Sequence, residues 1–170
     1  MKQNIFYTVI ILLFLSCNKE KYDSIPHGYY TVEYTNMAWG YQYNGWIINT
    51  DGNVMSFNLP TSNWNGTDSL GYISETDLLN NIAMCDTSIE KVTERKLYLN
   101  NKLIQGAAMG TLTEKKNTSN DAGSTKYSCY QYDIEMDAFK KVILNVEGDW
   151  SYHNESTEAK KITTWMKKIN

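Results

Sequence analysis

The dipeptide Asp51-Gly52, set between two alternating apolar segments, is the feature that most constrains the fold of this chain. Asp-Gly is favoured in tight type I′ turns, because both positions tolerate a positive φ. The segments 43–50 and 53–59 are therefore predicted to be the two arms of a β-hairpin. Three apolar side chains share one face of the second arm and indicate which side meets a core: Met55, Phe57 and Leu59.

The same alternation predicts three further strands. One runs over residues 29–35, with every second residue apolar or aromatic. The other two cover 126–134 and 139–146, and the short link between them makes this pair a second hairpin. Five strands joined mainly by short turns indicate an antiparallel sheet.

Three stretches carry helix signals. Ser74 precedes two acidic residues and an apolar face, and residues 86–88 offer the cap of a longer helix that Gly110 would end. A third helix is expected to begin at Asn154 or Ser156 and to run to residue 169. Its apolar stripe, with Trp165 as a core residue, follows the i, i+3, i+4, i+7 spacing: Ile162, Trp165, Met166 and Ile169. The order β-β-β-α-α-β-β-α predicts an α+β fold, with an antiparallel β-sheet of about five strands and three helices packed on it.

Length and charge narrow the class of protein. A chain of 170 residues fits one domain and buries a core without an obligatory metal or disulfide lattice. Its net charge of -3 gives no general attraction to nucleic acid, because phosphate binding needs a basic face. We therefore expect no nucleic-acid partner.

The N-terminus has the pattern of a secretory signal: Lys2, then an uncharged apolar run over residues 5–15, then Ser16-Cys17. About eleven helical residues cover roughly 16 Å, half of the hydrocarbon core of a bilayer, so we expect no permanent transmembrane helix here. Residues 14–17, Phe-Leu-Ser-Cys, resemble the lipobox of bacterial lipoproteins, with Phe14 where that pattern prefers Leu. In that family the cysteine is lipidated and becomes the first residue after cleavage.

The resemblance implies a diacylglyceryl thioether on Cys17 and stable anchoring to a membrane. It also implies a place in the bacterial cell envelope, lipid-anchored to the outer membrane at its periplasmic face or at the cell surface. Residues 1–16 are then a signal peptide, 17–28 the lipidated cysteine with a flexible tether, and 29–170 a single α+β domain. The closing stretch, from residue 121 through the 154–165 helix, resembles small uncharacterised lipoproteins of Bacteroidota, from which no activity transfers.

The sequence contains few features that are typical of an enzyme active site. The sequence contains no nucleophile elbow, HExxH, P-loop or GxGxxG motif, and two histidines are too few for a zinc set. We expect no metal and no cofactor. A hydrolase using the carboxylates Glu147 and Asp149 is the alternative function, although turn and cap roles also explain these acids.

Cys85 and Cys129 are the cysteines that remain after lipidation of Cys17. One interpretation is a disulfide between them, which an oxidising compartment would favour and which would close a loop of 45 residues. Cys85 also ends an apolar helix face, where a buried free thiol is common. Both readings stay open at this point.

Aromatic residues gather in the first half of the chain, interleaved with Asn, Gln and Gly: Trp39, Tyr41, Tyr43, Trp46, Trp64 and Tyr72. Such a set suits sugar stacking or a protein interface, and it is also what an aromatic-rich sheet contains. The candidate binding residues are those in or near loops: Trp39, Tyr41, Tyr43 and Trp64. The sequence thus predicts an envelope lipoprotein with a non-enzymatic binding or accessory role, its partner being an envelope protein or a glycan.

Overall fold

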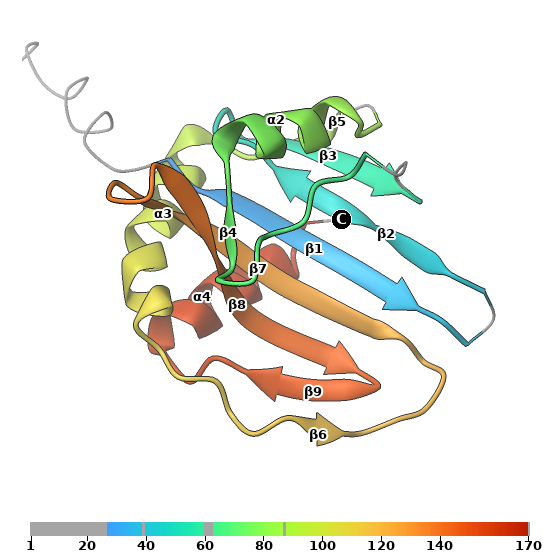
Figure 1. Ribbon diagram of the computed structural model, residues 1–170. Helices are drawn as coiled ribbons and strands as arrows, with labels where there is room; N and C mark the ends of the chain where they lie inside the picture. Colours follow the sequence, from blue (N-terminus) through green and yellow to red (C-terminus); the bar gives the residue numbers. More distant parts are fainter. Residues whose placement is uncertain (1–26, 39, 60–62, 87, 170) are drawn as a thin grey trace, which may run out of the picture.

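The computed structural model describes residues 27–38, 40–59, 63–86 and 88–169. Its centre is a nine-stranded sheet with the order β5-β3-β2-β1-β7-β8-β9-β6, and β4 pairs with β8 beside this path (Figure 1). Every pair of neighbouring strands is antiparallel. The strands are β1 (Tyr29–Asn36), β2 (Gln42–Ile48), β3 (Asn53–Asn58), β4 (Tyr72–Ile73), β5 (Ser88–Lys91), β6 (Lys116–Asn117), β7 (Ser124–Asp133), β8 (Ala138–Gly148) and β9 (Trp150–His153).

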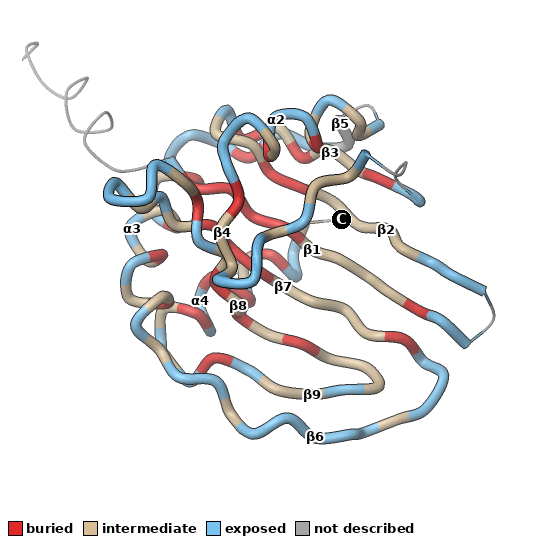
Figure 2. The backbone as a smooth tube through the Cα atoms, in the orientation of Figure 1, coloured by how far each residue is buried: buried red, intermediate tan, exposed pale blue. Residues whose placement is uncertain are grey.

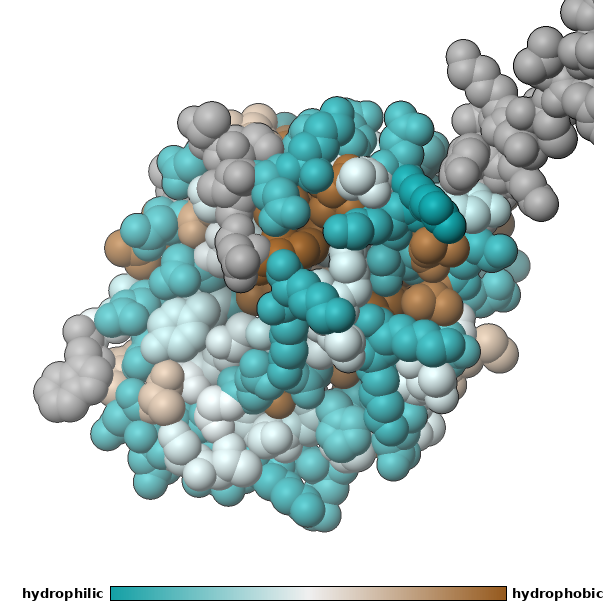
Figure 3. Space-filling view, turned by 180° about the vertical axis from the view of Figure 1, so that it is seen from behind, coloured by the Kyte–Doolittle hydropathy of each residue, from teal (hydrophilic) through white to brown (hydrophobic). Residues whose placement is uncertain are grey.

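Helices cover both faces of the sheet. The described residues form α2 (Glu75–Ala83), α3 (Glu94–Ala108) and α4 (Thr157–Met166). In Figure 1, α2 and β4 cross one face, which we call the α2 face, and α3 and α4 lie on the other, the α3/α4 face. Seen from the α3/α4 side, hydrophilic side chains surround apolar surface in the upper half of the molecule (Figure 3).

Each face has its own apolar core, because successive residues of a strand point to opposite sides. In β1, Tyr29 belongs to the cluster under α2, and Tyr30 belongs to the larger cluster under α3 and α4. Buried residues are concentrated in the part of the sheet that the helices cover, whereas most residues in the rest of the sheet are only partly buried (Figure 2). The ion pair and the aromatic rings of the candidate site described next lie on the α2 face, beyond that helix.

The hairpin predicted around Asp51-Gly52 is confirmed as β2–β3, but its turn differs from the predicted type I′. The Asn49 N–H donates to the Asn53 carbonyl at 3.1 Å, so the loop contains three residues. Gly52 alone among them has a left-handed φ, +81°, as in hairpins that combine a type I turn with a bulge. A Cβ on Gly52 would lie 2.5 Å from the Val92 carbonyl oxygen, so this position also requires glycine for close contact with the chain before α3.

The α+β class and the antiparallel pairing are confirmed, whereas the predicted count of five strands is too low. The predicted strands correspond to β1, β2, β3, β7 and β8. The four additional ones, β4, β5, β6 and β9, are only two to four residues long. Such short strands show no periodicity and form because tertiary contacts bring these segments beside their partner strands.

The helix predictions are confirmed for two of three starting points. Ser74 caps α2 and Ser156 caps α4, each accepting a backbone N–H of the first turn. The expected cap at residues 86–88 is wrong, because β5 pairs there with β3 and α3 begins only after the cap Thr93. No helix in the described part of the chain is long and apolar enough to span a bilayer.

Candidate functional site

A largely buried ion pair lies on the α2 face, on two strands that β7 separates. Lys141 of β8 donates to Glu33 Oε2 of β1 at 2.5 Å. The other carboxylate oxygen of Glu33 accepts the Tyr43 hydroxyl at 2.9 Å. The side chains of Glu33 and Lys141 are 14% and 16% exposed. We call these residues, with Tyr130 beside Lys141, the Glu33 cluster.

Strand register places these groups on one face. In the ladder Tyr130 is opposite Lys141, and Glu33 is opposite Gly45 of β2, two residues from Tyr43. A Cβ on Gly45 would lie 1.8 Å from the Val32 carbonyl oxygen, so no larger residue fits in this row. The Lys141 ammonium also lies 5.6 Å from the centre of the Tyr130 ring, within cation–π range.

The charge states in the cluster are fixed by its neighbours. Burial alone would raise the pKa of Glu33, but the Lys141 ammonium outweighs burial and holds that pKa below its ordinary value. Burial would lower the pKa of Lys141, but Tyr130 and Glu33 raise it above the usual range. Burial raises the pKa of Tyr43, and the Glu33 carboxylate raises it further. All three shifts lead away from neutrality, so at pH 7 Glu33 is ionised, Lys141 is protonated and Tyr43 is neutral.

Four aromatic rings extend this cluster towards solvent, and we call them the aromatic patch: Tyr41, Tyr43, Phe57 and Trp64. The Tyr41 and Tyr43 rings are stacked at 6.3 Å, and Trp64 meets Tyr43 edge-on at 6.1 Å. The Trp64 and Phe57 ring centres lie 4.7 Å apart. Phe57 is 3% exposed whereas Tyr41 is 58% exposed, so the patch runs from the sheet surface to the outside.

The chain around Trp64 is held in place by an amide pair. The Asn65 N–H donates to Asn81 Oδ1 at 2.8 Å, and Asn81 Nδ2 donates back to the Asn65 carbonyl at 2.8 Å. Asn81 is buried on α2. A loop residue bonded twice to a buried helix position is pre-organised, which reduces the entropy that binding costs.

The structure brings together three of the four predicted binding residues, Tyr41, Tyr43 and Trp64. Trp39 and the predicted lipidation site Cys17 lie outside the described residues. Glu33 and Lys141 were missed, because alternation assigned them to a solvent-facing side of their strands. The expected core residue Trp165 is half-buried, with its ring edge-on to Tyr30 at 5.0 Å.

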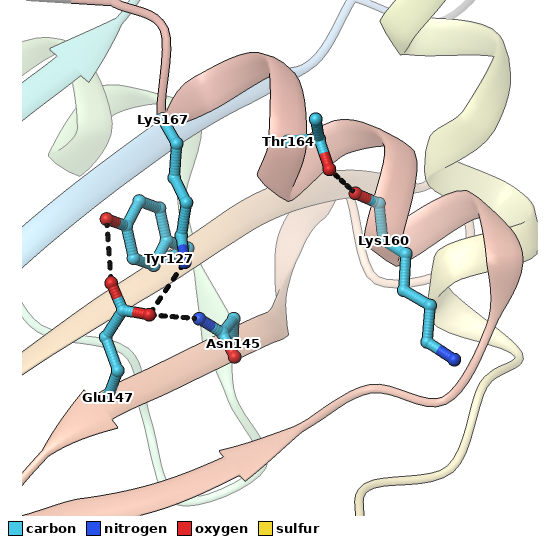
Figure 4. A network of polar contacts seen from close by, with 6 residues as sticks. All are labelled: Tyr127, Asn145, Glu147, Lys160, Thr164 and Lys167. Carbon is cyan, nitrogen blue, oxygen red and sulfur yellow. Dashed lines mark hydrogen bonds and ion pairs between the residues drawn. The ribbon is translucent and has the colours of Figure 1, made fainter.

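Glu147, one acid of the alternative hydrolase, lies on the α3/α4 face in a network of polar contacts (Figure 4). Its Oε2 accepts from Lys167 at 2.7 Å and from Asn145 at 3.2 Å, and its Oε1 accepts from Tyr127 at 3.2 Å. Burial acts to raise the pKa of Glu147, but Lys167 brings it below the ordinary value. A low pKa makes this carboxyl a poor general acid.

Asp149, the other acid, organises a loop. Its carboxylate accepts the backbone N–H groups of Ala122 and Gly123 at 2.9 and 3.0 Å, and the Ser119 hydroxyl at 3.1 Å. Within the described residues, no group of three or more His, Cys, Asp or Glu side chains is placed to hold a metal ion.

Cys85 and Cys129 are free thiols in the structure. Cys129 is buried in the core under α3 and α4, whereas Cys85 packs against the cluster under α2, where its thiol donates to the Asn81 carbonyl at 3.3 Å. The sheet therefore lies between the two sulfur atoms. Burial raises the pKa of Cys85 to about 11, so this thiol is not the activated thiolate that redox catalysis needs.

Comparisons with protein-family models, with curated proteins and with solved structures found no match for this chain.

Proposed function

We propose that this protein is a lipid-anchored component of the bacterial cell envelope that binds another envelope component through the aromatic patch, without catalysing a reaction. The partner is an envelope protein or a glycan. The observation that carries this proposal is the convergence of three aromatic rings onto one surface beside a largely buried ion pair. Tyr41 directly precedes β2 and Tyr43 lies at the start of that strand, whereas Trp64 comes from the segment between β3 and β4.

The chemistry of the patch supports binding. Aromatic faces supply a large contact area at a low cost in side-chain entropy, and they stack on sugar rings or fill pockets of a protein partner. The Tyr41 side chain is exposed and can contact a partner directly. The position of Trp64 is fixed by the hydrogen bonds between Asn65 and Asn81. The pKa values of Glu33, Tyr43 and Lys141 lie away from neutrality, which favours a binding role over acid–base catalysis.

The anchoring part of the proposal has its support in the sequence alone. The apolar run that ends in Ser16-Cys17 predicts lipidation of Cys17 and attachment to the outer membrane, at its periplasmic face or at the cell surface. The test is metabolic labelling with a fatty acid in cells that express the wild type or Cys17→Ser. We expect label on the wild type only, and an uncleaved precursor for the variant. Equal label on both proteins contradicts anchoring through Cys17.

The binding part is tested with Tyr41→Ala and Trp64→Ala, and Trp150→Ala serves as the matched control. Trp150 lies on β9, is 41% exposed, and contacts Lys115 rather than the patch. Pull-downs from envelope extracts and glycan arrays are compared among the four proteins. We expect both patch variants to lose, at least tenfold, a partner that the wild type and Trp150→Ala retain.

Thermal melting separates recognition from stability in this experiment. Tyr41→Ala is expected to melt close to the wild type, because more than half of that residue is exposed. Trp64→Ala is expected to lose some stability, since its ring covers Phe57. A partner bound equally by wild type and Tyr41→Ala places recognition elsewhere on the molecule and contradicts the proposal.

A further inference from the structure

A groove opens on the α3/α4 face, between the chain that leads into α3 and the last turns of α4. Its volume is about 520 Å³, within the range of small-molecule sites. It lies on the side of the sheet opposite the aromatic patch. Its lining is Glu90, Lys91, Val92, Thr93, Lys96, Lys160, Lys161, Thr164, Trp165, Lys168 and Ile169.

Positive charge dominates the groove. Five of its eleven lining residues are lysines, all exposed, and one is a carboxylate, Glu90. The whole chain has a net charge of -3, so the charge of this surface is opposite in sign to that of the chain. Between described residues the two ion pairs are Lys141–Glu33 and Lys167–Glu147, and neither includes a lysine of the groove. Like charges gathered around a concave surface focus an attraction for anions.

The floor of the groove is apolar. Val92 is buried, and Trp165 and Ile169 are half-buried against the core under α3 and α4. Thr164, at the wall, donates its hydroxyl to the Lys160 carbonyl at 2.7 Å (Figure 4). A ligand in this groove therefore meets ammonium groups around it and an indole with aliphatic carbon beneath it.

We propose that this groove binds a phosphate ester, with the phosphate among the lysines and an apolar or planar part of the ligand over Trp165. A phosphate carries up to two negative charges and several acceptor oxygens, so it can accept hydrogen bonds from several ammonium groups at once. A single carboxylate would leave most of these positive charges uncompensated. The lining contains no arginine, which is the side chain suited to planar, two-point recognition of a carboxylate. This inference stands apart from the aromatic patch and from lipidation of Cys17.

Two sources offer this chemistry: a lipid headgroup in a bilayer and a soluble phosphate compound. Lysine acetylation, read residue by residue by mass spectrometry, distinguishes them on the full chain. In one arm the chain is in a neutral detergent and is titrated with pyrophosphate, or with citrate as a polyanion without phosphate. In the other it is reconstituted into vesicles of phosphatidylcholine, with or without phosphatidylglycerol. The reference lysines are Lys116 and Lys140, which are exposed and outside the groove.

The variant Lys160→Gln/Lys161→Gln removes two charges from exposed positions of α4, and Lys116→Gln/Lys140→Gln removes two elsewhere. We expect ligand to protect Lys96 and Lys168 several-fold while the reference lysines stay reactive. The groove variant should raise the concentration of ligand or anionic lipid that gives half-maximal protection by roughly tenfold or more, since each lysine near an anionic surface contributes about 1 kcal/mol. The control variant should leave it unchanged.

Protection by pyrophosphate identifies a soluble phosphate ligand, and protection only by phosphatidylglycerol vesicles identifies a headgroup. Either result, if lost in the groove variant, supports the proposal. Three results overturn it: no protection in either arm, equal protection of the reference lysines, or protection by citrate equal to that by pyrophosphate.

Discussion

Lys141 and Glu33 meet on the α2 face although 108 residues separate them in the chain. Their strands are not neighbours, because β7 lies between β1 and β8. The pair thus ties together three central strands, and its two charges are largely removed from water. Burying a pair of charges costs desolvation energy for each of them. Removing one partner leaves the other charge buried and uncompensated, so it lowers the free energy of unfolding more than removing both.

We predict that Glu33→Gln and Lys141→Met each destabilise the domain, and that the double variant is more stable than the sum of the two effects implies. Breaking a fully buried pair costs roughly 3–5 kcal/mol, and the partial exposure of these side chains reduces this to about 2 kcal/mol. Urea unfolding of the wild type, both single variants and the double variant measures the coupling. Strictly additive effects would show that the pair does not act as a unit.

The same pair predicts how stability depends on pH. The pKa of Glu33 is lower in the folded protein than its ordinary value of 4.5, so the unfolded chain takes up the proton first on acidification. The stabilisation by Glu33 is therefore complete above about pH 5 and is lost as the pH falls through the lower, folded pKa. We expect the difference in unfolding free energy between wild type and Glu33→Gln to shrink from pH 7 towards pH 3. A constant difference over this range would contradict an ionised, paired Glu33.

Local patterns in the sequence account for the main strands and for two helix starts. Alternation identified β1, β2, β3, β7 and β8, and cap residues identified the starts of α2 and α4. The two-residue strand β4 shows no such pattern, since it is ordered by its pairing with Phe139 and Lys140 of β8. The helix predicted from residue 86 failed for a related reason: this segment completes a sheet edge before Thr93 begins α3.

The candidate site was predictable only in part. Tyr41, Tyr43 and Trp64 were identified because aromatic residues near loops are unusual and suited to binding. Glu33 and Lys141 each occupy a polar position of an alternating strand, which indicates solvent. Their burial depends on the order of β1, β7 and β8 in the sheet and on the neighbouring aromatic side chains, and no local pattern encodes either.

We predict that Cys85 and Cys129 of protein secreted to the periplasm are both alkylated after unfolding without a reductant. The structure has both as free thiols, in cores on opposite faces of the sheet. In the folded protein Cys129 should be unreactive because it is fully buried, and Cys85 should react slowly at pH 8 because its pKa is about 11. Peptide mapping by mass spectrometry measures both sites. A peptide that links the two cysteines would contradict the free-thiol state.

We predict opposite effects for two Ser→Ala substitutions. The Ser128 hydroxyl on β7 is fully buried and has no hydrogen-bond partner among the described residues, whereas Ser156 caps α4 by accepting the Ala159 N–H at 3.1 Å. Removing a buried polar group without a partner removes its desolvation cost, so Ser128→Ala should leave stability unchanged or raise it by up to about 1 kcal/mol. Removing a helix cap should cost Ser156→Ala about 1 kcal/mol.

Urea unfolding of the wild type and these two variants under the same conditions measures both effects, and the shared chemistry of the substitution makes each the control of the other. A loss of more than about 1 kcal/mol in Ser128→Ala would mean that this hydroxyl has a hydrogen-bond partner in solution, since removing one partner leaves the other buried and unsatisfied. An unchanged Ser156→Ala would mean that the first turn of α4 is held by its apolar contacts under Ala159 and Ile162 rather than by its cap.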